Sequence, residues 1–329
     1  MPLDGFGRSI DYLRISLTDH CNLRCVYCMP LSGLRFARTV ELLAAAELER
    51  VVRAAVTVGF RKVRLTGGEP TLRPDLVDIV ERLAPIPGLL DLAMTTNAIL
   101  LPRLAGRLAS AGLRRVNIHV DSLHPGRLQR LMRFGTVEEI WAGIEAAEAV
   151  GLRPIKLNVV VVRGYNDEDV VELARLTQTR DWHVRFIELM PLGGGECARL
   201  AVAQYVSNAE TSHQIEQALG PLTLLPNQQP TDESQNFRIG DARGVVGLIS
   251  PVSRPYCGTC NRMRLTADGK FHLCLLNDDE IDLRRSLREG ADDTAIQNLL
   301  LRAVAAKPTG HRLARGLSTE ERNMYQIGG

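Results

Sequence analysis

Between residues 11 and 190 the sequence alternates short β-like runs with longer helical patterns at a roughly even spacing. One helical pattern, residues 41–59, ends at Gly59, a suitable C-terminal cap. Strands separated by helices pair in parallel through right-handed crossovers. The β-like runs are residues 12–18, 61–67, 89–97, 114–122, 153–162 and 183–189. Six such units predict an open TIM-type barrel or a doubly wound sheet, and periodicity alone does not separate the two.

The pattern weakens after Met190. Residues 191–200 resemble a loop, and residues 226–237 are polar and rich in turn formers, which predicts a linker or mobile loop. Shorter β-like pieces and a last helical stretch follow, at residues 243–251, 262–274 and 294–305. We therefore expect an α/β domain over residues 1–195 and an α+β extension over residues 196–329.

Composition excludes several classes of function. Lysine and arginine number 40 against 38 acidic residues, so no bulk positive charge exists to hold nucleic acid. The first residues lack the apolar segment of a secretory signal, and the longest apolar run, residues 156–162, is too short to cross a bilayer. We expect a cytoplasmic protein without membrane or nucleic-acid partners. There, cysteines stay reduced and more often bind metals or catalyse reactions than form disulfides.

The seven cysteines form two triplets, with Cys197 alone. The first triplet, Cys21, Cys25 and Cys28, has C-x3-C-x2-C spacing after the first predicted strand. Structural zinc takes four ligands, and iron–sulfur clusters normally take four cysteines. A cluster held by three cysteines leaves one iron open to a substrate or cofactor. The spacing favours a catalytic cluster, with structural metal as the alternative.

The second triplet, Cys257, Cys260 and Cys274, also lacks a fourth cysteine. Cys197 could complete it, although a lone cysteine is more often simply buried. Zinc remains an alternative for this triplet too. Arg262 and Arg264 follow Cys260 and share one face if this segment is a strand. Arginine suits the bidentate recognition of phosphate.

The first triplet together with "TGGEP", residues 66–70, resembles the radical S-adenosylmethionine (SAM) superfamily. The whole set, including the second triplet and the terminal "IGG", resembles the GTP 3′,8-cyclase family over nearly the entire chain. This family catalyses the first step of molybdenum cofactor biosynthesis. The resemblance implies a six-stranded, open barrel with one 4Fe–4S cluster, and a C-terminal extension that carries a second 4Fe–4S cluster.

The resemblance also implies roles for individual residues. The two triplets would bind the clusters. SAM would be contacted by Tyr27, Gly68, Glu69, His119 and Met190. GTP would be bound by Arg14, Arg64, Thr95, Lys156, Arg262, Met263 and Arg264. Arg264 and the terminal Gly328 and Gly329 would act in catalysis. Lys62 and Arg185 lie on strands near the same edge and could help, although any one of these cations could equally be a solvated or salt-bridged charge.

Two positions depart from the family pattern: His119 stands where a serine is usual, and Ala98 where a glycine is usual. The implied reaction begins when a 5′-deoxyadenosyl radical removes the ribose 3′ hydrogen of GTP. The resulting carbon radical attacks C8 of guanine, and reduction gives 3′,8-cyclo-7,8-dihydro-GTP. The implied partners are a flavodoxin-like or other reductant, a downstream cyclic pyranopterin monophosphate synthase and a second copy of the chain.

Two alternatives stay open at this stage. A different radical SAM enzyme with an auxiliary cluster would act on a peptide or another nucleotide. An iron–sulfur or zinc module without enzymatic activity would explain the cysteines but not "TGGEP" or the cations on the strands.

Overall fold

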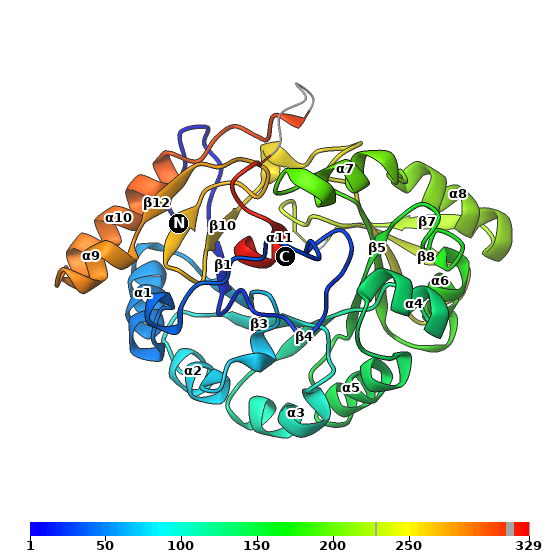
Figure 1. Cartoon of the computed structure of the whole chain (residues 1–329), viewed down its shortest axis with the longest axis horizontal. Coiled ribbons are helices and arrows are strands. Elements are labelled where there is room, and N and C mark those ends of the chain that lie inside the picture. Colours follow the sequence, from blue (N-terminus) through cyan, green and yellow to red (C-terminus); the bar gives the residue numbers. More distant parts are fainter. Residues whose placement is uncertain (228, 314–318, 329) are drawn as a thin grey trace.

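The computed structural model describes residues 1–227, 229–313 and 319–328. Its centre is a run of parallel strands that follow the chain order, each paired with the next. Figure 1 shows them curving around a central space, as in a barrel, which decides against a doubly wound sheet. The strands are β1 (Tyr12–Ser16), β2 (Lys62–Thr66), β3 (Asp91–Thr96), β4 (Arg115–His119), β5 (Lys156–Val161) and β6 (His183–Glu188).

Helices cover the outside of this barrel (Figure 1). Helix α1 ends at Gly59, whose φ of 115° lies in the left-handed region, so the predicted cap is confirmed. The short helix α4 (Pro125–Met132) was not expected from the sequence. The helices of this part are α1 (Ala45–Val58), α2 (Leu76–Leu83), α3 (Leu101–Ser110), α4 (Pro125–Met132), α5 (Val137–Ala149) and α6 (Val170–Thr179).

The C-terminal part extends the same sheet at both edges. β9 pairs in parallel with β6, and β10 pairs in parallel with β1. Antiparallel strands then lengthen each side, so that, within the described ranges, β7 and β12 end a sheet of 12 strands. These strands are β7 (Leu222–Leu225), β8 (Gln235–Ile239), β9 (Val245–Ile249), β10 (Arg262–Leu265), β11 (Lys270–His272) and β12 (Glu280–Asp282). A division of the chain at residues 195 and 196 stays a prediction.

The remaining helices are α7 (Gly195–Ala203), α8 (Asn208–Leu219), α9 (Arg284–Arg288), α10 (Asp293–Ala305) and α11 (Met324–Ile327). The loop expected over residues 191–200 is wrong in its second half, because α7 begins at Gly195 and buries Cys197 and Ala201. The linker expected over residues 226–237 is also wrong in part, because β8 begins at Gln235. This segment connects two neighbouring strands of one sheet.

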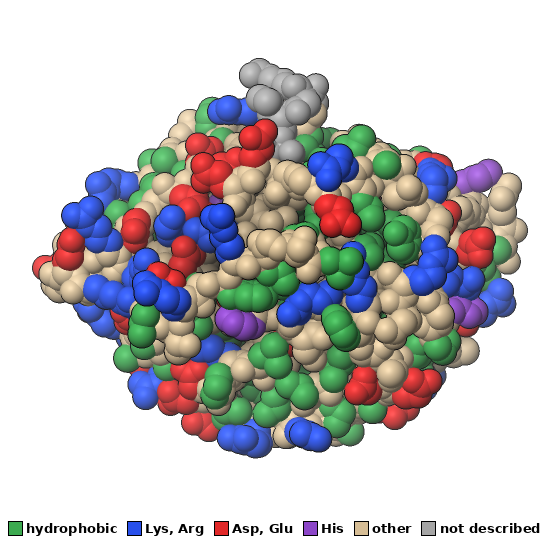
Figure 2. Space-filling view, viewed as in Figure 1, with side chains coloured by type: hydrophobic (Ala, Val, Ile, Leu, Met, Phe, Trp, Pro, Cys, Tyr) green, Lys and Arg blue, Asp and Glu red, His purple; other side chains and the backbone are tan. Residues whose placement is uncertain are grey.

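Alternation along the strands separates an apolar layer from a charged interior. Leu13 and Ile15 of β1 are buried in the hydrophobic core, whereas Tyr12 and Arg14 have the opposite orientation. TIM barrels usually fill their interior with branched apolar side chains. A charged interior therefore indicates a place for a ligand. Basic and acidic side chains are interspersed over the face seen in Figure 2. No helix in the described ranges is long and apolar enough to span a membrane.

Candidate active site

The first cysteine triplet lies in the loop after the carboxyl end of β1. Backbone hydrogen bonds from Cys28 and Met29 to the Cys25 carbonyl, 2.9 and 3.0 Å long, form a tight turn. Burial raises the pKa of Cys21 to about 12. Burial also raises the pKa of Cys28, and the neighbouring Cys25 and Cys21 raise it further. Cys25 is buried, and Cys21 and Cys28 are partly exposed. As thiolates, the three would repel one another, so they suit a cationic centre. Within the described ranges, no three His, Cys, Asp or Glu side chains converge on a single metal ion, whereas the cysteines of a 4Fe–4S cluster each bind a different iron.

The "TGGEP" turn packs against the loop that leads to this triplet. The Gly68 N–H donates to the Thr18 carbonyl over 2.7 Å, and the Glu69 N–H donates to the His20 carbonyl over 2.7 Å. A Cβ atom at Gly68 would lie 2.3 Å from the His20 carbonyl oxygen. Only glycine permits this approach, so Gly68 helps to set the position of the first cysteine loop.

The Glu69 carboxylate is buried and largely satisfied by the protein itself. Its Oε1 accepts from Thr71 N at 3.0 Å, Thr71 Oγ1 at 2.6 Å and Thr96 Oγ1 at 2.7 Å, and its Oε2 accepts from Asn97 N at 2.7 Å. Burial raises the pKa of Glu69, although these bonds act against the change. Glu69 thus ties the turn after β2 to the turn after β3. Its expected contact with SAM stays a prediction.

His119 and Tyr27 meet beside Cys25. The Tyr27 hydroxyl donates to Asp121 Oδ2 over 2.6 Å, and its oxygen lies 2.8 Å from His119 Nε2. The same nitrogen lies 3.0 Å from Asp121 Oδ2 and 4.0 Å from Cys25 Sγ. Burial lowers the pKa of His119, but Asp121 overcomes this effect and raises it well above the ordinary value. Ala98 adopts a φ of 68°, in the region that favours glycine.

The C-terminal tail reaches the same end of the barrel, and Figure 1 shows α11 in the central space. Ser16 Oγ donates to the Ile327 carbonyl over 2.7 Å, and Tyr325 makes a backbone hydrogen bond to the Cys28 thiol. A Cβ atom at Gly328 would lie 2.3 Å from Ser16 Oγ. Gly328 therefore lies against "TGGEP", whereas the contact of the tail with the first triplet is made by Tyr325. Gly329 lies outside the described residues.

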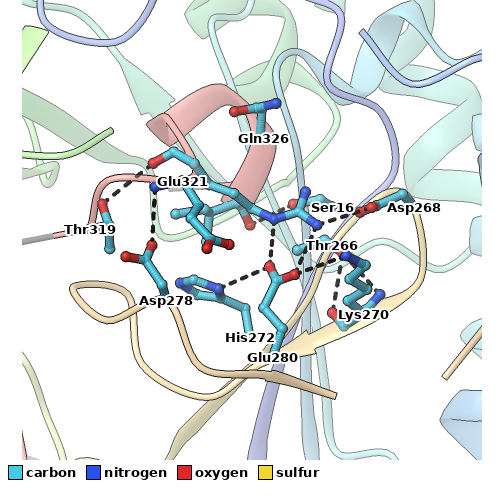
Figure 3. Close-up of polar contacts among 12 residues, drawn as sticks. Ser16, Thr266, Asp268, Lys270, His272, Asp278, Glu280, Thr319, Glu321 and Gln326 are labelled. Carbon is cyan, nitrogen blue, oxygen red and sulfur yellow. Dashed lines mark hydrogen bonds and ion pairs between the residues drawn. The ribbon is translucent and has the colours of Figure 1, made fainter. Parts of the chain in front are cut away.

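Arg322 fastens this tail to the turn between β10 and β11 and to the start of β12, where Asp268 and Glu280 lie (Figure 3). Its Nη2 lies 3.0 Å from Asp268 Oδ2, and its Nε lies 2.5 Å from Glu280 Oε1. Asp278 accepts from the backbone of Glu320, over 3.0 Å. The hairpin of β11 and β12 also carries Cys274 of the second triplet, so the tail links the two cysteine sites.

Met190 follows β6 and is half-buried. Cys197 does not complete the second triplet: its Sγ donates to the Val26 carbonyl over 3.5 Å, within the first cysteine loop. Burial raises the pKa of Cys197 to about 11, as for an inert buried thiol.

The second triplet lies at the opposite end of the barrel, where β10 begins. Arg8 Nη1 holds the Cys257 carbonyl at 2.7 Å. Burial raises the pKa of Cys260, but Lys307 and Arg262 overcome this effect and lower it to about 7. A hydrogen bond from His311 lowers the pKa of Cys257 despite burial, whereas burial raises that of Cys274. Two of these thiols thus have surroundings that favour the thiolate, the form that binds metal.

Cations from neighbouring strands line the interior between the two triplets. Arg264, Arg14 and Arg64 occupy the same register position on β10, β1 and β2. A cavity of about 390 Å³ opens at the amino ends of the strands, and its walls include Lys62, Arg64, Arg115, Lys156, Arg185 and Arg262. Lys62 and Arg185 were expected near the edge that carries "TGGEP". That prediction is wrong for Lys62, which begins β2 and lines the cavity at the other end.

Several polar atoms of this interior lack a partner among the described residues. They are Thr95 Oγ1, Arg14 Nε, Arg185 Nε, Arg262 Nη1 and Arg264 Nε. Burial lowers the pKa of Arg64 to about 9, with a contribution from Arg14. Buried donors without acceptors, and cations without enough negative charge, are the features expected of a polyanion site.

Met263 has the opposite orientation from its neighbours. Its side chain is fully buried in the hydrophobic core, whereas Arg262 and Arg264 face the interior. Any contact of residue 263 with substrate would therefore be made by its backbone.

Sequence reasoning missed Arg115 and His183, which begin β4 and β6, although alternation along each strand could have indicated them. It also missed Glu233, which lies 2.6 Å from Arg14; the predicted linker gave no signal for it.

Two family models match the chain: the radical SAM superfamily over residues 15–177, and the molybdenum cofactor synthesis C-terminal family over residues 182–313. A GTP 3′,8-cyclase of Pelotomaculum thermopropionicum is 46% identical over 328 residues, covering 99% of both chains. One of Heliobacterium modesticaldum is 46% identical, covering 99% of this chain and 100% of the relative.

Solved structures agree on the fold. Streptococcus suis SuiB bound to S-adenosylmethionine aligns with a TM-score of 0.60 at 15% identity, covering 88% of this chain and 68% of that chain. Methylornithine synthase (PylB) aligns with a TM-score of 0.50 at 15% identity, covering 64% and 63%. The full-length similarity decides the family: the chain belongs to the GTP 3′,8-cyclases of the radical SAM superfamily.

Proposed function

We infer that this protein is a GTP 3′,8-cyclase, a lyase that converts GTP to 3′,8-cyclo-7,8-dihydro-GTP in molybdenum cofactor biosynthesis. The similarity to curated cyclases over 99% of the chain supports this activity. The structural observation that carries the inference is the cation-lined interior with one cysteine triplet at each end. An anionic nucleotide held there would lie between the two cysteine sites.

At the carboxyl end of the strands, Cys21, Cys25 and Cys28 would hold a 4Fe–4S cluster, and SAM would bind beside it. When bound, this pair supplies the radical chemistry of the reaction. Gly68 brings the "TGGEP" backbone close to the cluster loop. Tyr27, His119 and Met190 would contact SAM, with Asp121 fixing the orientation of the first two. Glu69 would complete the site through its backbone and its Oε2.

In the interior, the cations and Thr95 would bind GTP. Lys156, Arg64 and Arg185 face the cavity and suit the phosphates. Arg14, Arg262 and Arg264 lie closer to the second triplet, where they would orient the nucleotide. Cys257, Cys260 and Cys274 would hold the second 4Fe–4S cluster, whose open iron would bind the purine. A five-residue strand such as β1 is roughly 15 Å long, which sets the separation of the two ends of the barrel.

Arg264 and the glycine tail are the residues proposed to act in catalysis. Arg264 projects from the strand that follows Cys260, and its Nε is buried without a partner in the described structure. It could donate to the guanine as C8 is reduced. Gly328 would help to close the site around the ribose, together with Gly329. A reductant, a downstream cyclic pyranopterin monophosphate synthase and a second copy of the chain are the proposed partners.

The activity is tested with anaerobically reconstituted protein, dithionite, SAM and either GTP or ATP. We expect 5′-deoxyadenosine and a cyclised product with GTP but not with ATP. Cys257→Ala should abolish the product, whereas Cys197→Ala, a matched control outside both triplets, should retain it. Formation of 5′-deoxyadenosine with GTP left intact would instead favour a radical enzyme that acts on a peptide or another nucleotide.

A further inference from the structure

Glu233 lies in the cation-lined cavity, on the loop between β7 and β8. Its side chain is 13% exposed, and its Oε2 lies 2.6 Å from Arg14 Nη2 and 3.1 Å from Arg262 Nε. Its Oε1 lies 3.9 Å from Arg64 Nη1 and 4.0 Å from Arg185 Nη1. One carboxylate is thus surrounded by four arginines, all of which are proposed to bind GTP.

The same loop places two further acceptors on cavity cations. The Gln229 side-chain oxygen accepts from Lys62 Nζ, and the Thr231 carbonyl accepts from Arg262 Nη2 over 2.9 Å. Glu233, Gln229 and Thr231 of one short loop therefore already supply acceptors to cations of the cavity. The loop also forms part of the cavity wall.

This neutralisation is incomplete. No described residue forms a hydrogen bond or ion pair with the Lys156 amino group. Burial lowers the pKa of Arg185 to about 10, even though Glu233 acts in the opposite direction. A triphosphate carries several negative charges and more acceptor oxygens than one carboxylate, so it can compete with Glu233 for Arg14 and Arg262.

We propose that Glu233 is a displaceable stand-in for a substrate phosphate: it occupies Arg14 and Arg262 in the free protein and must leave them when a polyphosphate binds. The proposal deepens the function proposed above, since it concerns the same cavity. Glu233 would keep the buried arginines neutralised before the substrate arrives. The same contact would reduce the affinity for polyphosphate, because each ligand must first break these ion pairs.

The test compares Glu233→Gln with Asp232→Asn in the full-length, reconstituted protein. Asp232 also borders the cavity but forms no ion pair with any lysine or arginine in the described ranges. The probes are inorganic tripolyphosphate and GTP, with affinity measured by titration calorimetry. We expect Glu233→Gln to bind tripolyphosphate about tenfold more tightly than the natural protein, and Asp232→Asn to differ by less than about twofold.

Unchanged or weaker tripolyphosphate binding by Glu233→Gln would overturn the proposal, because Glu233 would then organise the arginines or contact the ligand. The variant could lose stability, since four arginines would lose their counter-charge. Its melting temperature is therefore followed against tripolyphosphate concentration, and it should rise more steeply than that of the natural protein. Tripolyphosphate contains no guanine, so this result is independent of whether the protein cyclises GTP.

Discussion

Lys156 shows how the surroundings change an ordinary side chain. It begins β5 and points into the cation-lined cavity. Burial, together with repulsion from Arg185, Arg115 and Arg64, lowers its pKa to about 7. In the free protein its proton is therefore partly lost near neutral pH. A bound polyphosphate would stabilise the charged form and raise the pKa again.

Polyphosphate binding should accordingly take up a proton at Lys156. Between pH 6 and pH 8, titration calorimetry with tripolyphosphate should show the natural protein losing affinity relative to Lys156→Arg, by at most about tenfold per pH unit. The sign follows because Lys156 is charged below its lowered pKa and neutral above it, whereas arginine stays charged. Tripolyphosphate itself also titrates over this range, and this changes the affinity of both proteins alike. The difference between the two proteins therefore isolates Lys156. Parallel pH profiles for the two proteins would contradict the assignment.

At the scale of elements, the tail and the β11–β12 hairpin act together. Arg322, just before α11, forms ion pairs with Asp268, just before β11, and with Glu280 of β12, and the hairpin carries Cys274. At the other end of the tail, Ile327 accepts from Ser16 beside the first cysteine loop. Arg322 is thus placed to position Gly328 without touching either proposed cluster.

Arg322→Gln should lower kcat/KM for GTP by about tenfold while leaving the affinity for tripolyphosphate unchanged, because the cation-lined cavity lies at the opposite strand ends. Arg322→Lys, which retains the charge, should recover part of the loss. The deciding comparison is made in a chain that lacks residues 328–329. If Arg322 acts through the tail, Arg322→Gln should not lower the kcat/KM of this shortened chain any further. A full additional loss would show a different role.

At the scale of the whole molecule, the barrel separates two kinds of chemistry. The proposed SAM site is formed by loops after the carboxyl ends of β1, β2 and β4. The proposed nucleotide site is formed by side chains along the strands and at their amino ends. Tyr27 belongs to the first group and Lys156 to the second. Rigid strands hold the two groups apart.

Substitutions at the two ends should therefore act independently. Tyr27→Phe removes the hydroxyl that contacts Asp121 and His119, and we expect it to weaken SAM binding several-fold without changing the GTP affinity. Lys156→Gln should weaken GTP binding several-fold without changing the SAM affinity. The double variant should be additive within about 0.5 kcal/mol in both affinities. Coupling well above that value would mean that the two ends communicate.

The sequence by itself determined the βα repeat, both cysteine triplets and the candidate cations, because these depend on local periodicity and spacing. It also contained the alternation that turns Met263 away from Arg262 and Arg264. Only the tertiary structure decided which strand end each cation faces, the location of Cys197 beside the first triplet and the insertion of Glu233 among four arginines. These contacts join residues far apart in the chain: Glu233 and Arg14, for example, are 219 positions apart. Local patterns cannot specify such pairs, because folding alone brings them together.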